Sequence, residues 1–85
     1  SGPSSALFAL NSPLLWKLAE HFAKRVEKEA GNDRVRQVEY VYLLALCRPP
    51  RENELEIGIQ FLRSGNTLTD YSHMIFGLNE FIYVH

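Results

Sequence analysis

The sequence lacks most of the features that mark a membrane protein or a nucleic-acid binder. Cys47 is the one cysteine in 85 residues, so no internal disulfide can form. No apolar run reaches the roughly 18 residues that a membrane-spanning helix needs. Nine basic and ten acidic residues give a formal charge of -1 and therefore no field that would concentrate nucleic acid. We expect no membrane insertion and no nucleic-acid partner.

Sites for metal, cofactor or nucleophilic chemistry are also missing. No two of the soft metal ligands, which are His21, His73, His85 and Cys47, have the spacing that would place them on one ion from one element. Ser72 and His73 are adjacent, and adjacent residues of a helix point about 100° apart, so they cannot share a proton directly. There is no glycine-rich phosphate loop and no CxxCH haem attachment. We expect no catalytic residue, no metal and no cofactor.

Residues 35–50, VRQVEYVYLLALCRPP, are apolar almost all round and then stop at two prolines. This pattern predicts a central buried helix, because only a helix surrounded by neighbours tolerates apolar residues on every face. Asn32 and Asp33 offer the caps at its start, and the prolines end it near Cys47. Arg48 then meets the negative end of the helix dipole, although a contact with an anion or a partner is the alternative interpretation.

The preceding helix is predicted over residues 13–30. Ser12 caps it, proline occupies its first turn, and Gly31 ends it. Arg25 and Glu29 stand four residues apart and are expected to pair on its polar face. Its predicted buried stripe consists of Leu15, Leu18, Ala19, Phe22, Ala23, Val26 and Ala30.

After the two prolines, the sequence predicts a helix that closes at residues 64–66. Arg51 is a poor cap for it, whereas the acidic residues of its first turns have the right sign for its positive end. These are Glu52, Glu54 and Glu56. Gly58 falls within the apolar stripe, where it costs roughly 0.8 to 1 kcal/mol relative to alanine. We expect the close approach of a neighbouring backbone to compensate.

The last predicted helix begins with a capping box formed by Thr67 and Asp70. Residues 81–84 either finish this helix or extend along the surface, and the sequence leaves both open. Residues 5–10 are predicted to form one or two helical turns near the amino end. We interpret residues 1–5 as a tag scar or linker and residues 6–85 as a single all-α domain, a small bundle of four to five helices. The predicted buried stripe of the last helix is Tyr71, Met74, Ile75 and Leu78.

Several aromatic residues either fill the core or anchor another domain. Trp16 lies off the centre of its helix's apolar stripe, which favours an interface for it more than for the others. A domain whose helices are apolar on more than one face usually packs against a neighbour. The candidate interface residues are Trp16, Tyr40, Phe81, Tyr83 and Arg48.

Three segments together carry a family resemblance, namely ALFALNSP (6–13), YLLALCRPPRENEL (42–55) and TDYSHMIFGLNEFIYV (69–84). They resemble the carboxy-terminal region of the planctomycete PSD-one family, a domain of unknown function. The resemblance implies a helical module of a large, exported bacterial protein that often carries cytochrome-c-like domains. The family usually has glycine where Cys47 stands and a threonine or serine cap where Arg51 stands. The resemblance therefore implies that the central helix here ends without a left-handed glycine.

Our interpretation is a non-catalytic interaction or structural module at the carboxy terminus of a larger bacterial protein, packing against its other domains or a protein partner. The first alternative is an accessory domain of an exported redox or polysaccharide-processing enzyme. The second is a helix-turn-helix that binds nucleic acid, which the intermixed Glu20, Glu27 and Glu29 oppose. The oligomeric state stays open. The basic residues of the nucleic-acid alternative are Lys17, Lys24, Arg25 and Lys28.

Overall fold

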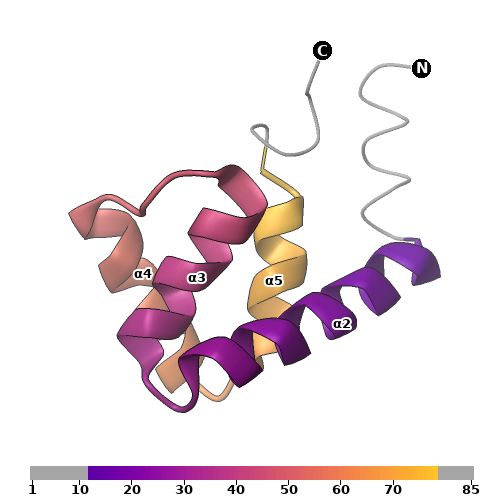
Figure 1. Ribbon diagram of the computed structural model, residues 1–85, viewed down its shortest axis with the longest axis horizontal. Coiled ribbons are helices and arrows are strands. Elements are labelled where there is room, and N and C mark those ends of the chain that lie inside the picture. The colour runs from indigo at the N-terminus through magenta and orange to yellow at the C-terminus, as the bar shows by residue number, and fades with distance from the viewer. Residues whose placement is uncertain (1–11, 79–85) are drawn as a thin grey trace.

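The computed structural model describes residues 12–78, which form four α-helices and contain no strand (Figure 1). These helices are α2 (Pro13–Ala30), α3 (Arg34–Leu46), α4 (Glu52–Arg63) and α5 (Leu68–Phe76). The predicted small all-α bundle is confirmed. The helical turns expected at residues 5–10, the open alternatives for residues 81–84 and the assignment of residues 1–5 fall outside the described residues.

The ends of α2 are set by local chemistry. The Ser12 hydroxyl accepts a hydrogen bond from the backbone N–H of Leu14 at 3.1 Å, and Pro13 fills the first helical position. At the other end Gly31 adopts a positive φ of 67°, and its N–H donates to the carbonyl of Glu27 at 2.8 Å. Both boundaries agree with those predicted from the sequence.

α3 begins at a carboxylate cap and ends at a left-handed residue. One Asp33 oxygen accepts from the N–H of Val35 at 3.0 Å and of Arg36 at 3.3 Å. Cys47 has φ 58° and ψ 33°, and its N–H donates to the carbonyl of Leu43 at 3.0 Å. The left-handed ending is therefore kept although a cysteine stands where glycine would adopt it without strain.

The prediction that α3 is buried on every side is wrong. Val38 and Val41 are fully buried, but Leu43 is 54% exposed and Val35 is exposed as well. α3 does contact α2, α4 and α5, but these neighbours lie along part of its circumference. The carboxy-terminal half of α3 consequently keeps an uncovered apolar side.

α4 crosses the core at Gly58, which is buried. A Cβ atom at this position would lie 2.5 Å from the Tyr71 hydroxyl of α5 and 2.9 Å from a methyl carbon of Val38 in α3. The expected close approach of a neighbouring backbone is therefore wrong, because side chains of α3 and α5 occupy the space beside Gly58. At its start, the Arg51 side chain supplies no cap, and the Arg51 N–H instead donates to Glu54 Oε1 at 2.7 Å.

α5 opens with the predicted capping box. The Asp70 N–H donates to Thr67 Oγ1 and the Thr67 N–H donates to an Asp70 carboxylate oxygen, each at 3.0 Å. Tyr71 and Ile75 face the core as predicted, whereas Met74 is exposed, contrary to the prediction.

The core lies where α3, α4 and α5 meet the small residues of α2. Ala19 and Ala23 are buried on α2, and α5 makes its most extensive contact with this helix. Leu18 was predicted to join them but is 51% exposed, because α5 packs against the alanine side of α2. The central cluster consists of Val26, Val38, Val41, Tyr42, Leu62, Tyr71 and Ile75.

Candidate interaction site

α2 carries apolar residues over more of its circumference than the core covers. At about 100° per residue, the buried Ala19 and Val26 lie on one side of the stripe, and Leu15, Leu18 and Phe22 lie within an adjacent arc of about 60°. The first group is buried, but Leu15 and Phe22 are only half-buried and Leu18 is exposed. α2 therefore presents a second apolar face that the bundle leaves partly open.

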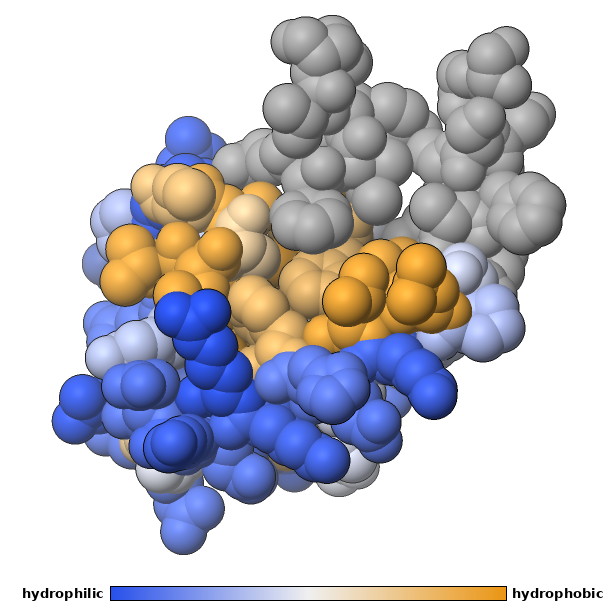
Figure 2. Space-filling model, turned by 45° about the vertical axis from the view of Figure 1, so that its right-hand side comes forward, coloured by the Kyte–Doolittle hydropathy of each residue, from blue (hydrophilic) through white to orange (hydrophobic). Residues whose placement is uncertain are grey.

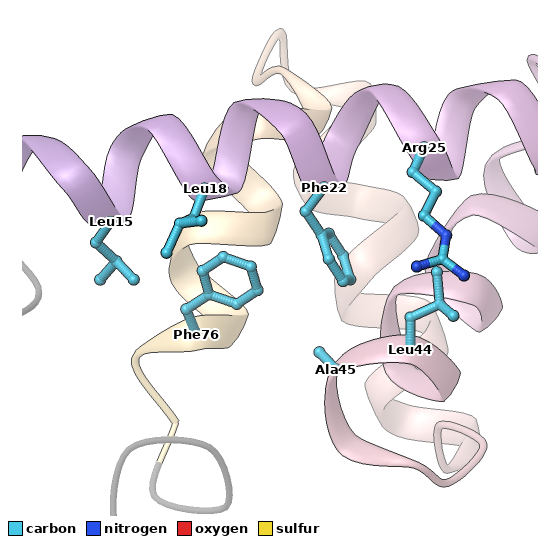
Figure 3. Close-up of a pocket in the computed structure, with 7 residues that line it drawn as sticks. All are labelled: Leu15, Leu18, Phe22, Arg25, Leu44, Ala45 and Phe76. Carbon is cyan, nitrogen blue, oxygen red and sulfur yellow. The ribbon is translucent and has the colours of Figure 1, made fainter.

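That second face forms one wall of a groove of about 350 Å³. Figure 3 shows the side chains of α2 pointing into this groove, with Phe76 of α5 and Leu44 and Ala45 of α3 opposite them. Arg25 supplies the one charged side chain among the lining residues that the structure describes. These residues are Leu15, Leu18, Phe22, Arg25, Leu44, Ala45 and Phe76.

The surface around the groove divides sharply by polarity. Figure 2 shows apolar side chains gathered over one region of the molecule, with a band of hydrophilic side chains below them. Leu14 extends the apolar region along α2, since it is 66% exposed and lies near Leu18 on the helical wheel. An exposed apolar region with a polar border is typical of a surface that binds another protein segment.

The polar border on α2 is basic. At about 100° per residue, four exposed residues with basic side chains lie within an arc of about 80°, next to the second apolar face of α2. Glu20 and Glu27 instead line a second hollow of about 270 Å³, together with Lys24 and the amino end of α5. These two carboxylates thus lie away from the groove, whereas the exposed Glu29 in the last turn of α2 falls within the arc of Leu15, Leu18 and Phe22, one turn beyond Arg25. The four residues of this basic border are Lys17, His21, Arg25 and Lys28.

Arg48 joins α3 to α4 within the molecule. Its guanidinium donates two hydrogen bonds to the Glu54 carboxylate, at 2.9 and 3.0 Å, and lies 5.3 Å from the centre of the Tyr42 ring. The Arg48 hydrogen bonds and the Arg51 N–H lower the pKa of Glu54 from its usual 4.5 to about 2. The contact stabilises the connection across Pro49 and Pro50, which is a structural role for this candidate interface residue.

Tyr71 is a buried phenol and not a reactive one. Burial raises its pKa well above the usual value, and the neighbouring Tyr42 and Glu54 act in the same direction. Ser72 is also buried, and its hydroxyl donates to the carbonyl of Leu68 at 2.8 Å. Neither side chain therefore has the exposed, activated oxygen that nucleophilic catalysis needs.

The remaining candidate interface residues are divided between surface and core. Trp16 is 41% exposed and stacks on His73 of α5, with 3.6 Å between the ring centres and an interplanar angle of 5°. Tyr40 is half-buried and packs against the core. Phe81 and Tyr83 fall outside residues 12–78.

The structure brings together no constellation for metal chemistry within residues 12–78, where no three His, Cys, Asp or Glu side chains form a cluster able to hold an ion. Within the same residues, none of the helices combines the length and the hydrophobicity needed to span a bilayer.

Sequence reasoning missed the groove, because it assigned Leu15, Leu18 and Phe22 to a single buried stripe. The available signal was the width of that stripe. With Leu14 included, the apolar residues of α2 occupy about half of its circumference, which is wider than one packing interface requires.

Comparison with known proteins identifies a family and nothing closer. Residues 1–62 match the family model PSD1, described as "Protein of unknown function (DUF1553)". The first two segments of the resemblance lie within this match, whereas residues 69–84 lie beyond it. No curated protein and no solved structure matches the chain. The matched part covers well over half of the 85 residues, so the chain belongs to the PSD1 (DUF1553) family.

Proposed function

We propose that this domain is a non-catalytic interaction module, which packs through its groove against another part of a larger protein of which it forms the carboxy-terminal region. The groove between α2, α3 and α5 is the observation that carries the proposal. It is lined mainly by apolar side chains, it is open, and three helices build it, so a folded scaffold holds it ready before anything binds.

Burial of the exposed leucines supplies a favourable free energy for such packing. Leu18 lines the groove and Leu14 lies beside it on α2, and both are more than half exposed. Complete burial of one leucine contributes about 1.5 to 3 kcal/mol relative to full exposure, so covering the remaining exposed parts of these two contributes a few kcal/mol. That amount is modest for association in solution, but it suffices when the partner is tethered in the same chain.

The proposal is tested by mixing this chain with the upstream part of the parent protein and measuring the dissociation constant by calorimetry. Leu18→Gln combined with Leu44→Gln removes apolar contacts from both walls, and we expect affinity to fall at least tenfold. Ile57→Gln is the matched control, because Ile57 is 61% exposed on α4 and does not line the groove. If the double variant binds as tightly as the wild type, the groove is not the docking surface.

The absence of an enzymatic role and the export of the parent protein are part of the same proposal. The buried, hydrogen-bonded Ser72 and the stacked His73 support a non-catalytic role within residues 12–78. Export is supported by the family resemblance alone, and fractionation of cells that express the tagged parent protein tests it. A redox or polysaccharide-processing activity of the parent that is lost with the double groove variant would assign the domain an accessory role in that enzyme.

A further inference from the structure

We infer that the groove accepts an amphipathic helix with acidic side chains along one edge, which face the basic border of α2. This inference rests on the proposed function and names the chemistry of the partner. It follows from two features, the dimensions of the groove and the distribution of charge beside it.

The dimensions suit a short helix. The lining residues of α2 run from Leu15 to Arg25, a distance of ten helical steps. This corresponds to about 15 Å, or roughly three turns of a helix lying alongside. α2 forms one wall, and α3 with α5 forms the other (Figure 3). An additional helix laid between these walls would complete the bundle, and apolar anchors at three- and four-residue steps would fill the groove.

The charges indicate which helix fits. Figure 3 shows the Arg25 side chain extending from α2 toward Leu44, at one end of the groove. Within residues 12–78 no carboxylate lies within ion-pair distance of Arg25, and the expected pair with Glu29 is not formed. Together with Lys17, His21 and Lys28, Arg25 makes a row of basic groups along one side of the groove face, and Glu29, one turn beyond Arg25, is the one α2 carboxylate that lies on that face. An acidic edge on the partner would pair with this row.

Two other occupants fit these observations less well. Residues 5–10, SALFAL, contain no charged residue that could meet the basic border. A second copy that docks through the same face would bring two basic rows together, and like charges in an interface disfavour the complex. Residues 79–85, NEFIYVH, contain Glu80 and are distinguished in the experiment.

In the experiment, a phage-displayed library of 14-residue peptides is selected for binding to the full chain. The peptides keep leucine at helical three- and four-residue steps, and their other positions vary among Glu, Lys, Gln and Ala. Affinities of the selected peptides are then measured by fluorescence anisotropy. We expect glutamate to be enriched along one edge, and its change to glutamine to weaken binding about three- to fivefold, as for an exposed ion pair.

Arg25→Glu should abolish or reverse the preference for glutamate. Lys24→Glu is the matched control with the same change of net charge, because Lys24 belongs to the second hollow and should leave the preference intact. Circular dichroism of both variants verifies folding. The selected peptides could bind less tightly to the Leu18→Gln, Leu44→Gln variant of the domain and yet show no preference for glutamate. That result would overturn the inference and leave the proposed function standing.

Three further outcomes are decisive. If no selected peptide depends on Leu18 and Leu44, the proposed function fails and the inference fails with it. If Glu80→Lys alters peptide affinity as strongly as Arg25→Glu, the chain's own residue pairs with Arg25 and the inference is overturned. Concentration-dependent dimerisation that the double groove variant abolishes would identify a second copy as the occupant, again overturning it.

Discussion

Gly58 lies where α4 meets both α3 and α5. The space that a side chain would need is occupied by the Tyr71 hydroxyl and by Val38. Tyr71 is 1% exposed and is held within the core, so it cannot move aside at little cost. Glycine is disfavoured in helices, yet here its missing Cβ permits the tyrosine of another helix to reach α4.

Gly58→Ala is therefore expected to destabilise the domain by about 1 to 2 kcal/mol, because overpacking outweighs the gain in helix propensity. Urea denaturation measures the difference. In a Tyr71→Phe background the cost should shrink, since the closest atom is gone. Glu56→Ala, at an exposed position of the same helix, serves as the control and should change stability by less than about 0.5 kcal/mol. A stabilising effect of Gly58→Ala would contradict the packing described here.

At Gly58 packing requires a glycine, whereas at Cys47 the backbone conformation favours glycine but the sequence has cysteine. Its φ of 58° is left-handed, which costs a residue with a Cβ about 1 to 2 kcal/mol. Cys47→Gly should raise the free energy of unfolding by about 0.5 to 1 kcal/mol after the greater chain entropy of glycine is deducted. Thermal denaturation under reducing conditions measures this gain. Cys47→Ala retains the Cβ atom, so an equal gain from alanine would show that backbone strain is not the cause.

At the scale of the elements, the connections between helices carry most of the directional polar interactions. Arg48 follows the end of α3, Glu54 lies in the first turn of α4, and the guanidinium joins them over the Tyr42 ring. A bidentate contact of this kind fixes orientation as well as distance, which a lysine could not do. The two prolines between the helices limit the backbone conformations that this contact must select.

Glu54 makes the stability of this connection dependent on pH. Its pKa in the folded protein is about 2, below the usual 4.5, so its stabilising contribution is complete above pH 4.5 and is lost as the pH falls toward 2. Glu54→Gln should lower stability at neutral pH by about 1 kcal/mol and reduce the decline between pH 4.5 and 2. Urea denaturation at a series of pH values measures both effects. An unchanged slope in the variant would show that Glu54 is not the titrating group, and Glu56→Gln supplies the comparison.

At the scale of the whole molecule, the core and the groove use the same kinds of apolar residue for different purposes. The alanine and valine side of α2 stabilises the fold, and its leucine side remains accessible. A substitution can therefore affect one property and spare the other. This separation is expected when an apolar surface serves association more than folding.

Leu18→Gln should change the free energy of unfolding by less than about 0.5 kcal/mol, because the side chain is half exposed already. Val26→Ala should cost about 2 kcal/mol, because it removes methyl groups from a fully buried position. Urea denaturation of both variants under the same conditions makes the comparison. A large loss of stability for Leu18→Gln would mean that the leucine side of α2 belongs to the core.

Prediction from sequence succeeded where the structure depends on neighbouring residues. The caps at Ser12, Asp33 and Thr67 and the helix end at Gly31 follow from local hydrogen bonds and backbone preference. The groove depends instead on which part of a wide apolar stripe α5 covers. That choice is made by the packing of distant helices, so the exposure of Leu18 could not be read from periodicity.

The stack of Trp16 on His73 gives the protein an internal optical reporter. The sequence has one tryptophan, so all indole emission comes from the contact between α2 and α5. Emission of an indole depends on the ring stacked against it, so separation of Trp16 from His73 should change the fluorescence. The docking of α2 on α5 can therefore be followed without any added dye.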